Sequence, residues 1–190
     1  MADTHTVEDV TAPEAPPRRR RISKRKAVEE HARSYLSAAA RRDAAGMGEH
    51  WDPDGVLDLV PLGIVRGREA IVESFRELFA AVPDMETVVG RLVPGEREVV
   101  VEWRMSGHFT GAPFQGIEPN GKYIELRGID LIEIANGKHV TNTAYYDGMS
   151  FARQVGLMPP ENSGAERAMK GAFNAVTKAR RAIAERRGEH

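Results

Sequence analysis

The chain has 190 residues and a net charge of −1, so it can form one domain with a real hydrophobic core and has no overall field that attracts nucleic acid or membrane. Hydrophobic residues make up 41% and charged residues 29%, which is ordinary for a globular protein. The absence of cysteine excludes disulfides, cysteine nucleophiles and cysteine-ligated metals, and it fits a cytoplasmic location.

The first 26 residues differ in composition from the rest of the chain. They are poor in apolar side chains and rich in proline and charge, so we expect a disordered tail. Residues 18–26 are strongly basic, and we expect a solvated arm rather than a contact for phosphate or membrane. No apolar segment follows these charges as in a signal peptide, and no run approaches the roughly 20 apolar residues of a membrane span.

Two amphipathic helices are predicted in the first half of the chain. Residues 26–44 carry apolar side chains at helical spacing, namely Val28, Ala32, Tyr35, Leu36 and Ala39. Residues 68–82 do the same with Ile71, Phe75, Leu78, Phe79 and Val82. Between them we predict a helical turn over residues 47–51, a break at the WDPDG segment and a strand over residues 56–60.

Strands dominate the next segment. They are predicted over residues 85–93, 98–109, 123–134 and 139–146, and Asn136-Gly137 favours a primed hairpin turn because both central positions need positive φ. The loop over residues 110–121 is long and rich in glycine and proline, which is typical of a lid or a contact surface. Asp147 is placed to cap a short helix over residues 149–155.

The last predicted helix, residues 165–186, has a sparse apolar stripe between many charges, made of Met169, Phe173, Val176 and Ile183. We expect it to pack on the domain or on a partner chain rather than on a membrane surface. The chain therefore divides into a tail (1–26), one domain (27–160) and a C-terminal amphipathic helix (161–190).

The order of these elements, and four segments in particular, resemble the nuclear transport factor 2-like superfamily, especially its SnoaL-like polyketide cyclases and ketosteroid isomerases. The segments are SYLSAAARRDAAGMGEHWDPDG, VRGREAIVESFRELF, SGHFTGAPFQGIEPNGK and GIDLIEIANGKHVTNTAYYDGMSFARQVGLMPP. The resemblance implies an α+β cone, in which a curved, mixed but mainly antiparallel sheet wraps around the N-terminal helices. It also implies a pocket between the sheet and the first helix, and a homodimer through the open sheet face.

Asp130 is the best candidate that the strand pattern itself supplies. It is the only charged residue among the even positions of its strand, which are otherwise Ile124, Leu126, Gly128, Ile132 and Ile134. A carboxyl there loses solvation, which raises its pKa. We expect it to be neutral at pH 7 and able to donate a hydrogen bond to a developing oxyanion. The alternative is an aspartate satisfied by backbone or hydroxyl partners at a bulge.

The resemblance adds Tyr35 and Asp58. Tyr35 stands eight residues before Asp43, as in ketosteroid isomerases, which implies that Tyr35 and Asp130 donate hydrogen bonds to a substrate carbonyl oxygen. The alternative is a core tyrosine. The position of the isomerase general base falls on Leu59, so the neighbouring Asp58 serves as base only if the register slips or a bulge intervenes. Otherwise Asp58 is an exposed or hairpin-paired carboxylate.

Other residues are candidates for the pocket wall. Phe79 and Trp103 are expected there, and His108 is a weaker candidate, because alternation places it on the polar strand face. Asn142 and Tyr146 share a face with Ala144, where related epoxide hydrolases carry an acid; the alanine counts against that activity. An uninterrupted two-residue turn would instead place Thr143 opposite Asp130, and the sequence leaves both registers open.

These observations predict a cofactor-free isomerase or aldol-type cyclase acting on a small hydrophobic carbonyl compound, polyketide- or steroid-like, through enolate stabilisation. Tyr35 and Asp130 would hold the enolate, and Asp58 or another residue would move the proton. Two alternatives are a non-catalytic protein that binds a small hydrophobic ligand and a dimeric interaction module. No histidine or carboxylate spacing suggests a metal site, and no motif suggests a cofactor.

Overall fold

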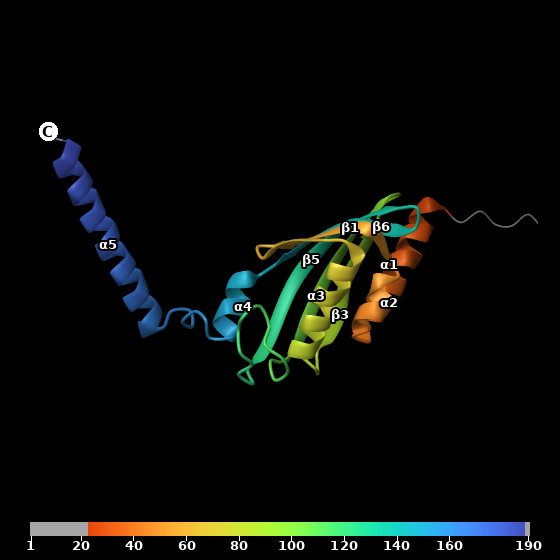
Figure 1. Ribbon diagram of the computed structural model, residues 1–190, viewed down its shortest axis with the longest axis horizontal. Coiled ribbons are helices and arrows are strands. Elements are labelled where there is room, and N and C mark those ends of the chain that lie inside the picture. Colours follow the sequence, from red (N-terminus) through yellow and green to blue (C-terminus); the bar gives the residue numbers. More distant parts are fainter. Residues whose placement is uncertain (1–22, 189–190) are drawn as a thin grey trace, which may run out of the picture.

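A six-stranded sheet is the framework of the molecule (Figure 1). The computed structural model describes residues 23–188. Its elements are α1 (Lys24–Ala40), α2 (Ala44–Gly48), β1 (Trp51–Val60), β2 (Gly63–Arg66), α3 (Arg68–Ala81), β3 (Glu86–Pro94), β4 (Glu98–His108), β5 (Tyr123–Ala135), β6 (Lys138–Tyr146), α4 (Gly148–Gln154) and α5 (Gly164–Gly188). No helix among the described residues is long and apolar enough to cross a membrane.

The sheet has the order β2-β1-β6-β5-β4-β3, in which β1 pairs with β6 in parallel and all other neighbours are antiparallel. Helices α1, α2 and α3 lie on one side of it (Figure 1). Helix α1 buries Val28, Ala32, Tyr35 and Ala38 against β3 and β4, as helical spacing requires. The predicted α+β fold, with helices held by a mixed and mainly antiparallel sheet, is confirmed.

Several element boundaries differ from the prediction, and in the strands tertiary pairing overrides the local signals. β1 begins at Trp51 rather than at residue 56, since a bulge between Trp51 and Val56 takes Pro53 and Gly55 into the strand. The edge strand β2 was not predicted, because four residues are too few for an alternation to be recognised. At the N-terminus, Ser23 caps α1, so the helix includes the end of the expected tail; residues 1–22 lie outside the described residues.

The β5–β6 hairpin decides the register that the sequence left open. Asn136 and Gly137 have φ values of 52° and 71°, which confirms the primed turn. A bulge between Glu133 and Ile134 then shifts the pairing, so that Asp130 stands opposite Ala144 and not opposite Thr143. Asn142, Ala144 and Tyr146 consequently face the helices.

Of the two C-terminal helices, α4 forms as predicted, whereas α5 does not pack on the domain. Asp147 caps α4 as predicted, accepting hydrogen bonds from the Ser150 backbone N at 2.9 Å and from its hydroxyl at 2.7 Å. Helix α5 extends away from the sheet (Figure 1), and its apolar stripe is 41–71% exposed. The expectation that this stripe packs on its own domain is therefore wrong, and packing on a partner chain stays a prediction.

Three histidines meet beside Tyr35. His31 from α1, His50 after α2 and His139 from β6 have ring centroids 4.8–6.4 Å apart. His139 is fully buried, and neither of its ring nitrogens has a hydrogen-bond partner among the described residues. Burial, with the nearby histidines, lowers the pKa of His139 to about 2, and burial with His50 and Lys138 lowers that of His31 to about 4. His31 and His139 are therefore neutral in the folded protein at pH 7.

This cluster predicts sensitivity to mild acid. In the unfolded chain His31 and His139 take up protons near pH 6.5, whereas in the folded chain they do not, so the free energy of unfolding decreases as the pH falls below that value. We expect the melting temperature to drop between pH 7 and pH 5, and to drop less in His139→Phe, which keeps an aromatic ring there. Parallel curves of melting temperature against pH for the two proteins would contradict this explanation.

Candidate functional site

A cavity of about 310 Å³ lies between the helices and the inner face of the sheet. Its wall is mainly apolar and aromatic, with side chains from α1, α3, β1, β4, β5 and the 110–121 loop. A small set of polar side chains interrupts it, namely Tyr35, Ser74, Glu77, Thr87, Gln115, Asp130, Asn142 and Tyr146. A cavity of this size, apolar with a few polar groups, is typical of small-molecule sites.

Asp130 is a carboxylate held by two N–H donors. Trp103 Nε1 donates to its Oδ1 at 2.8 Å, and Asn142 Nδ2 donates to its Oδ2 at 3.2 Å. Loss of solvation raises the pKa of Asp130 to about 6, and the two donors limit the rise because they favour the anion. The raised pKa was expected, but the expected neutral state at pH 7 is wrong, since a group with this pKa is mainly ionised there.

Gly128 makes this arrangement possible. It lies opposite Trp103 in the β4–β5 pairing, and a Cβ at Gly128 would overlap the indole ring of Trp103. The ring can therefore lie across the strand and reach Asp130, two residues further along, only because no side chain is present. In the sequence, Gly128 is one of the residues of the apolar strand face, and the strand pattern does not indicate that it makes room for Trp103.

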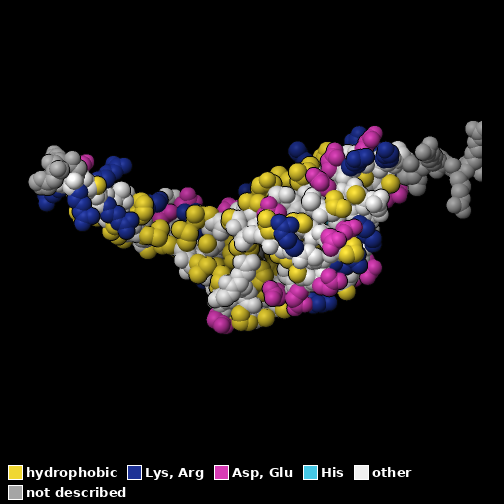
Figure 2. Space-filling view, turned by 45° about the horizontal axis from the view of Figure 1, so that its top comes forward, with side chains coloured by type: hydrophobic (Ala, Val, Ile, Leu, Met, Phe, Trp, Pro, Cys, Tyr) yellow, Lys and Arg dark blue, Asp and Glu magenta, His cyan; other side chains and the backbone are white. Residues whose placement is uncertain are grey.

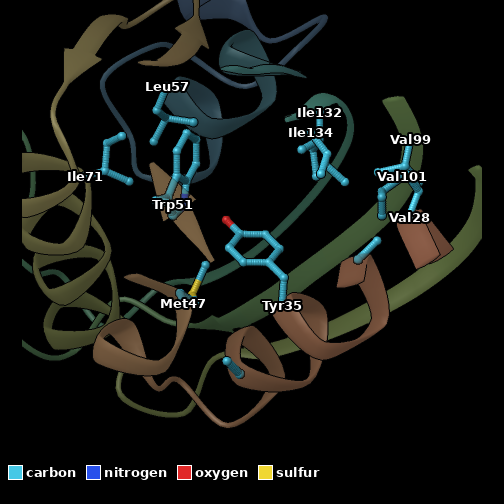
Figure 3. Packing of buried hydrophobic residues seen from close by; sticks show 12 residues of the cluster. Val28, Tyr35, Met47, Trp51, Leu57, Ile71, Val99, Val101, Ile132 and Ile134 are labelled. Atoms are coloured by element: carbon cyan, nitrogen blue, oxygen red, sulfur yellow. The ribbon is translucent and has the colours of Figure 1, made fainter. Parts of the chain in front are cut away.

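Tyr35 reaches the same cavity from α1. Its side chain is 3% exposed, and its ring packs edge-on against His139 with centroids 4.5 Å apart. Figure 3 shows the phenol directed away from α1, with its hydroxyl toward Trp51. Burial first, and then the charge of Asp130, raise the pKa of Tyr35, so the phenol keeps its proton and can act as a hydrogen-bond donor.

Asn142 has an unused acceptor at the cavity wall. The residue is 2% exposed, and its Nδ2 is occupied by Asp130. Its Oδ1 is buried without a hydrogen-bond partner among the described residues. Buried polar atoms normally have a partner, so this oxygen is suited to accept a hydrogen bond from a donor in the cavity.

The other expected wall residues are also in place. Phe79, Trp103 and Tyr146 line the cavity, and burial raises the pKa of Tyr146 to about 12. The 110–121 loop contributes Phe114 and Gln115. Backbone hydrogen bonds tie this loop to the end of α3, from Gly111 N to Ala81 O at 3.0 Å and from Ala112 N to Ala80 O at 2.9 Å.

Two predicted site residues lie outside the cavity. Leu57 and Leu59 line it, so the intervening Asp58 points to the outer face of the sheet, and no bulge falls between them to reverse it. His108 is exposed on the same outer face, where its Nδ1 lies 2.7 Å from Asp84 Oδ2. Strand alternation is the reason in both cases; the next residue after His108, Phe109, lines the cavity instead.

The role of Gly128 can be tested by Gly128→Ala. The added Cβ displaces the indole of Trp103, which should remove its hydrogen bond to Asp130 and raise the pKa of that carboxyl further. Crowding of the core should also cost about 1–3 kcal/mol of stability. Carboxyl NMR titration and chemical denaturation measure the two effects.

The matched control for that experiment is Gly171→Ala in α5, where an added Cβ meets no atom within 4 Å. Because alanine favours a helix, this control should be neutral or stabilising. An unchanged Asp130 titration in Gly128→Ala would show that Trp103 does not control the carboxyl.

Both the sequence and the structure of this chain resemble those of known proteins. Residues 29–155 match the sequence model of the SnoaL-like polyketide cyclase family. No curated protein matches the sequence. Similar solved structures include a SnoaL-like protein from Jannaschia sp. CCS1, with 19% identity over 74% of this chain and 99% of that chain and a TM-score of 0.66.

Two further structures are similar. TsrD from Streptomyces laurentii has 22% identity over 70% of this chain and 98% of that chain, with a TM-score of 0.62. A protein of ketosteroid isomerase-like fold from Catenulispora acidiphila DSM 44928, in complex with trimethylamine, has 19% identity over 67% and 92% and a TM-score of 0.56. At these identities the likeness establishes the fold alone.

Proposed function

This chain belongs to the SnoaL-like polyketide cyclase family, and from this premise we propose that it is an enzyme that abstracts a proton next to a carbonyl group. The substrate is a small hydrophobic compound, polyketide- or steroid-like, and the product arises by isomerisation or aldol-type ring closure. One observation carries the proposal: a carboxylate of raised pKa and a protonated phenol, Asp130 and Tyr35, line one apolar cavity.

Asp130 is assigned as the general base. A carboxylate with a pKa of about 6 is ionised at neutral pH yet more basic than an ordinary aspartate, which suits proton transfer near pH 7. The hydrogen bonds from Trp103 and Asn142 fix its orientation and leave one lone pair on each oxygen for the substrate. The sequence had suggested Asp58 as a possible base, and we assign that role to Asp130 instead.

Tyr35 is assigned as the donor to the developing oxyanion. When Asp130 removes the proton from the α-carbon, the electron pair moves to the carbonyl oxygen, which then accepts a hydrogen bond from the phenol. For an isomerisation, the protonated Asp130 returns the proton to another carbon of the enolate. For a ring closure, the enolate carbon attacks a second carbonyl of the same molecule, and the resulting alkoxide takes the proton.

Asn142 narrows the class of substrate. Its free Oδ1 accepts but cannot donate, so it is satisfied by a ligand that carries a hydroxyl or enol group near the reacting carbonyl. A β-hydroxy ketone, or an enolised β-diketone, presents such a donor beside the carbonyl oxygen. These are functional groups of polyketide-like compounds, and a steroid enone without a neighbouring hydroxyl would leave Asn142 unsatisfied.

The proposal is tested by exchange of α-hydrogens in D₂O, which needs no knowledge of the product. A panel of aromatic and alicyclic β-diketones and β-hydroxy ketones is incubated with the protein and followed by NMR. We expect the exchange rate to rise with pH through about 6, as Asp130 ionises, and then to level off.

Variants assign the roles. Asp130→Asn should reduce the exchange rate by about 10²–10⁴-fold, since an amide cannot take the proton. Tyr35→Phe should reduce it by about 10²-fold through loss of the oxyanion donor. Thr143→Val, on the outer face of the sheet and outside the cavity, is the matched control and should change it little. Full activity in Asp130→Asn would exclude the proposed base.

A binding protein without catalysis is the second candidate, and Ala144 favours it. The residue directly opposite Asp130 in the sheet has no acid–base group, and Glu77, the other carboxylate of the cavity wall, is exposed. If panel compounds bind in the cavity with wild-type protein but none exchanges faster than in buffer, the binding function replaces the enzymatic one.

A further inference from the structure

The inner face of β6 presents three side chains to the cavity in a fixed order. Asn142, Ala144 and Tyr146 all line it, and Ala144 stands opposite Asp130 in β5, while Tyr146 stands opposite Gly128. Neighbouring inner-face residues of a strand are about 6.6 Å apart, since each residue advances about 3.3 Å. The short side chain of Ala144 therefore leaves a space beside Asp130, with an amide on one side of this space and a phenol on the other.

Tyr146 lies at the open end of the row. A Cβ on Gly148 would lie 3.2 Å from Pro61 Cδ and 3.9 Å from Tyr146 Cε2, so the phenol ring lies beside the turn between β1 and β2. Leu62 in that turn lines the cavity and is 45% exposed. Figure 2 shows a hollow in the surface of the domain with apolar side chains inside it. Asn142, which is 2% exposed, marks the closed end of the row.

The hydroxyl of Tyr146 is not used by the fold. The N–H donors of the inner face, Trp103 Nε1 and Asn142 Nδ2, both go to Asp130, whereas the Tyr146 hydroxyl has no hydrogen-bond partner among residues 23–188. Burial raises the pKa of Tyr146 to about 12, so the phenol keeps its proton at neutral pH. A half-buried phenol without a partner is suited to donate a hydrogen bond to an oxygen of a ligand.

Two phenols thus reach the cavity from different elements, Tyr35 from α1 and Tyr146 from β6. Tyr146 and Asp130 are diagonal neighbours on adjacent strands, which places their backbones roughly 7–8 Å apart. Tyr35 already serves the carbonyl group next to the carbon that loses its proton. Tyr146 is displaced along the strand from that point, and a second carbonyl group of the same molecule is the acceptor that its position suits.

We propose that Tyr146 holds the second carbonyl group of the substrate and protonates the alkoxide that forms there. This role rests on the ring-closing form of the proposed function and adds a catalytic residue to it. Asp130 takes the α-proton, and the new carbon–carbon bond forms over Ala144. The π electrons of the second carbonyl move to its oxygen, which takes the proton of Tyr146.

The proton count closes at the open end of the cavity. The phenolate left on Tyr146 regains a proton from water there, and Asp130 releases the α-proton to water when the product leaves. No proton is gained or lost overall, and the cyclic product is an isomer of the substrate. No oxidant, reductant or further reactant is needed.

The order of groups on β6 also fixes the direction in which the substrate lies. The acceptor, Asn142 Oδ1, is at the closed end and receives the enol hydroxyl of a β-diketone. The donor, Tyr146, is at the open end and receives the second carbonyl oxygen. The substrate therefore enters with its β-diketone end first. An isomerisation, which involves one carbonyl group, would leave Tyr146 unused.

One compound reports both steps. The probe is a triketone in which a β-diketone is joined through three methylene groups to a phenyl ketone. The carbon between the two carbonyls of the β-diketone is the acidic one, and its attack on the phenyl ketone closes a six-membered ring. NMR in D₂O follows hydrogen exchange at that carbon, and chromatography follows the cyclic product, both relative to buffer alone. Exchange tests the proposed base, and ring closure tests Tyr146.

Tyr146→Phe removes the hydroxyl and keeps the ring, so the domain should fold. We expect the ratio of the ring-closure rate to the exchange rate to fall by about 10²-fold, as for the loss of one donor to an oxyanion. Tyr145→Phe makes the same change on the outer face of the sheet, where that residue is 54% exposed, and is the matched control. It should leave the ratio at the wild-type value.

An unchanged ratio in Tyr146→Phe would overturn the assignment. If both rates fall together, Tyr146 is a part of the cavity wall that both steps need, and if neither falls, the second carbonyl lies elsewhere. Wild-type protein that accelerates exchange but not ring closure would also overturn it, while leaving Asp130 as the base. Wild-type protein that accelerates neither step would remove the proposed function together with this role.

Discussion

The candidate site depends on the balance of forces on one carboxyl group. Asp130 lies in an apolar cavity, which penalises its charge, while Trp103 and Asn142 donate hydrogen bonds that favour the charge. The balance sets a pKa of about 6, between that of a solvated aspartate and that of a fully desolvated one. Asp130 is therefore a base of intermediate strength. The other features of the site hold its two hydrogen-bond donors in place.

Two features of the backbone maintain this balance. The bulge between Glu133 and Ile134 turns Asn142 toward Asp130, and Gly128 lets the indole of Trp103 cross the strand. On the other side of the cavity, the buried and neutral His139 packs against the ring of Tyr35 and places no charge beside the phenol. The two ring nitrogens of His139 are buried without a hydrogen-bond partner among the described residues, and the His139 ring packs against that of Tyr35.

The sheet separates two kinds of surface through the alternation of its side chains. Its inner face carries the carboxylate, the amide and the aromatic wall of the cavity. Its outer face carries exposed apolar side chains, among them Val93, Ile129, Leu131 and Tyr145. A substitution on the outer face therefore leaves the lining of the cavity unchanged, because no side chain belongs to both faces.

The sequence by itself determined the fold class and nearly all elements, because the periodicities of α1, α3 and the long strands are strong local signals. It also identified Asp130, Tyr35, Phe79, Trp103, Asn142 and Tyr146 as residues that could meet. Tertiary structure alone decided which partners Asp130 has, and hence its ionisation, because hydrogen bonds between strands depend on register, and a single bulge shifts register. The pairing of β1 with β6 also fixes which side chains of β1 face the cavity. It places Asp58 on the outer face, where it cannot act as the base.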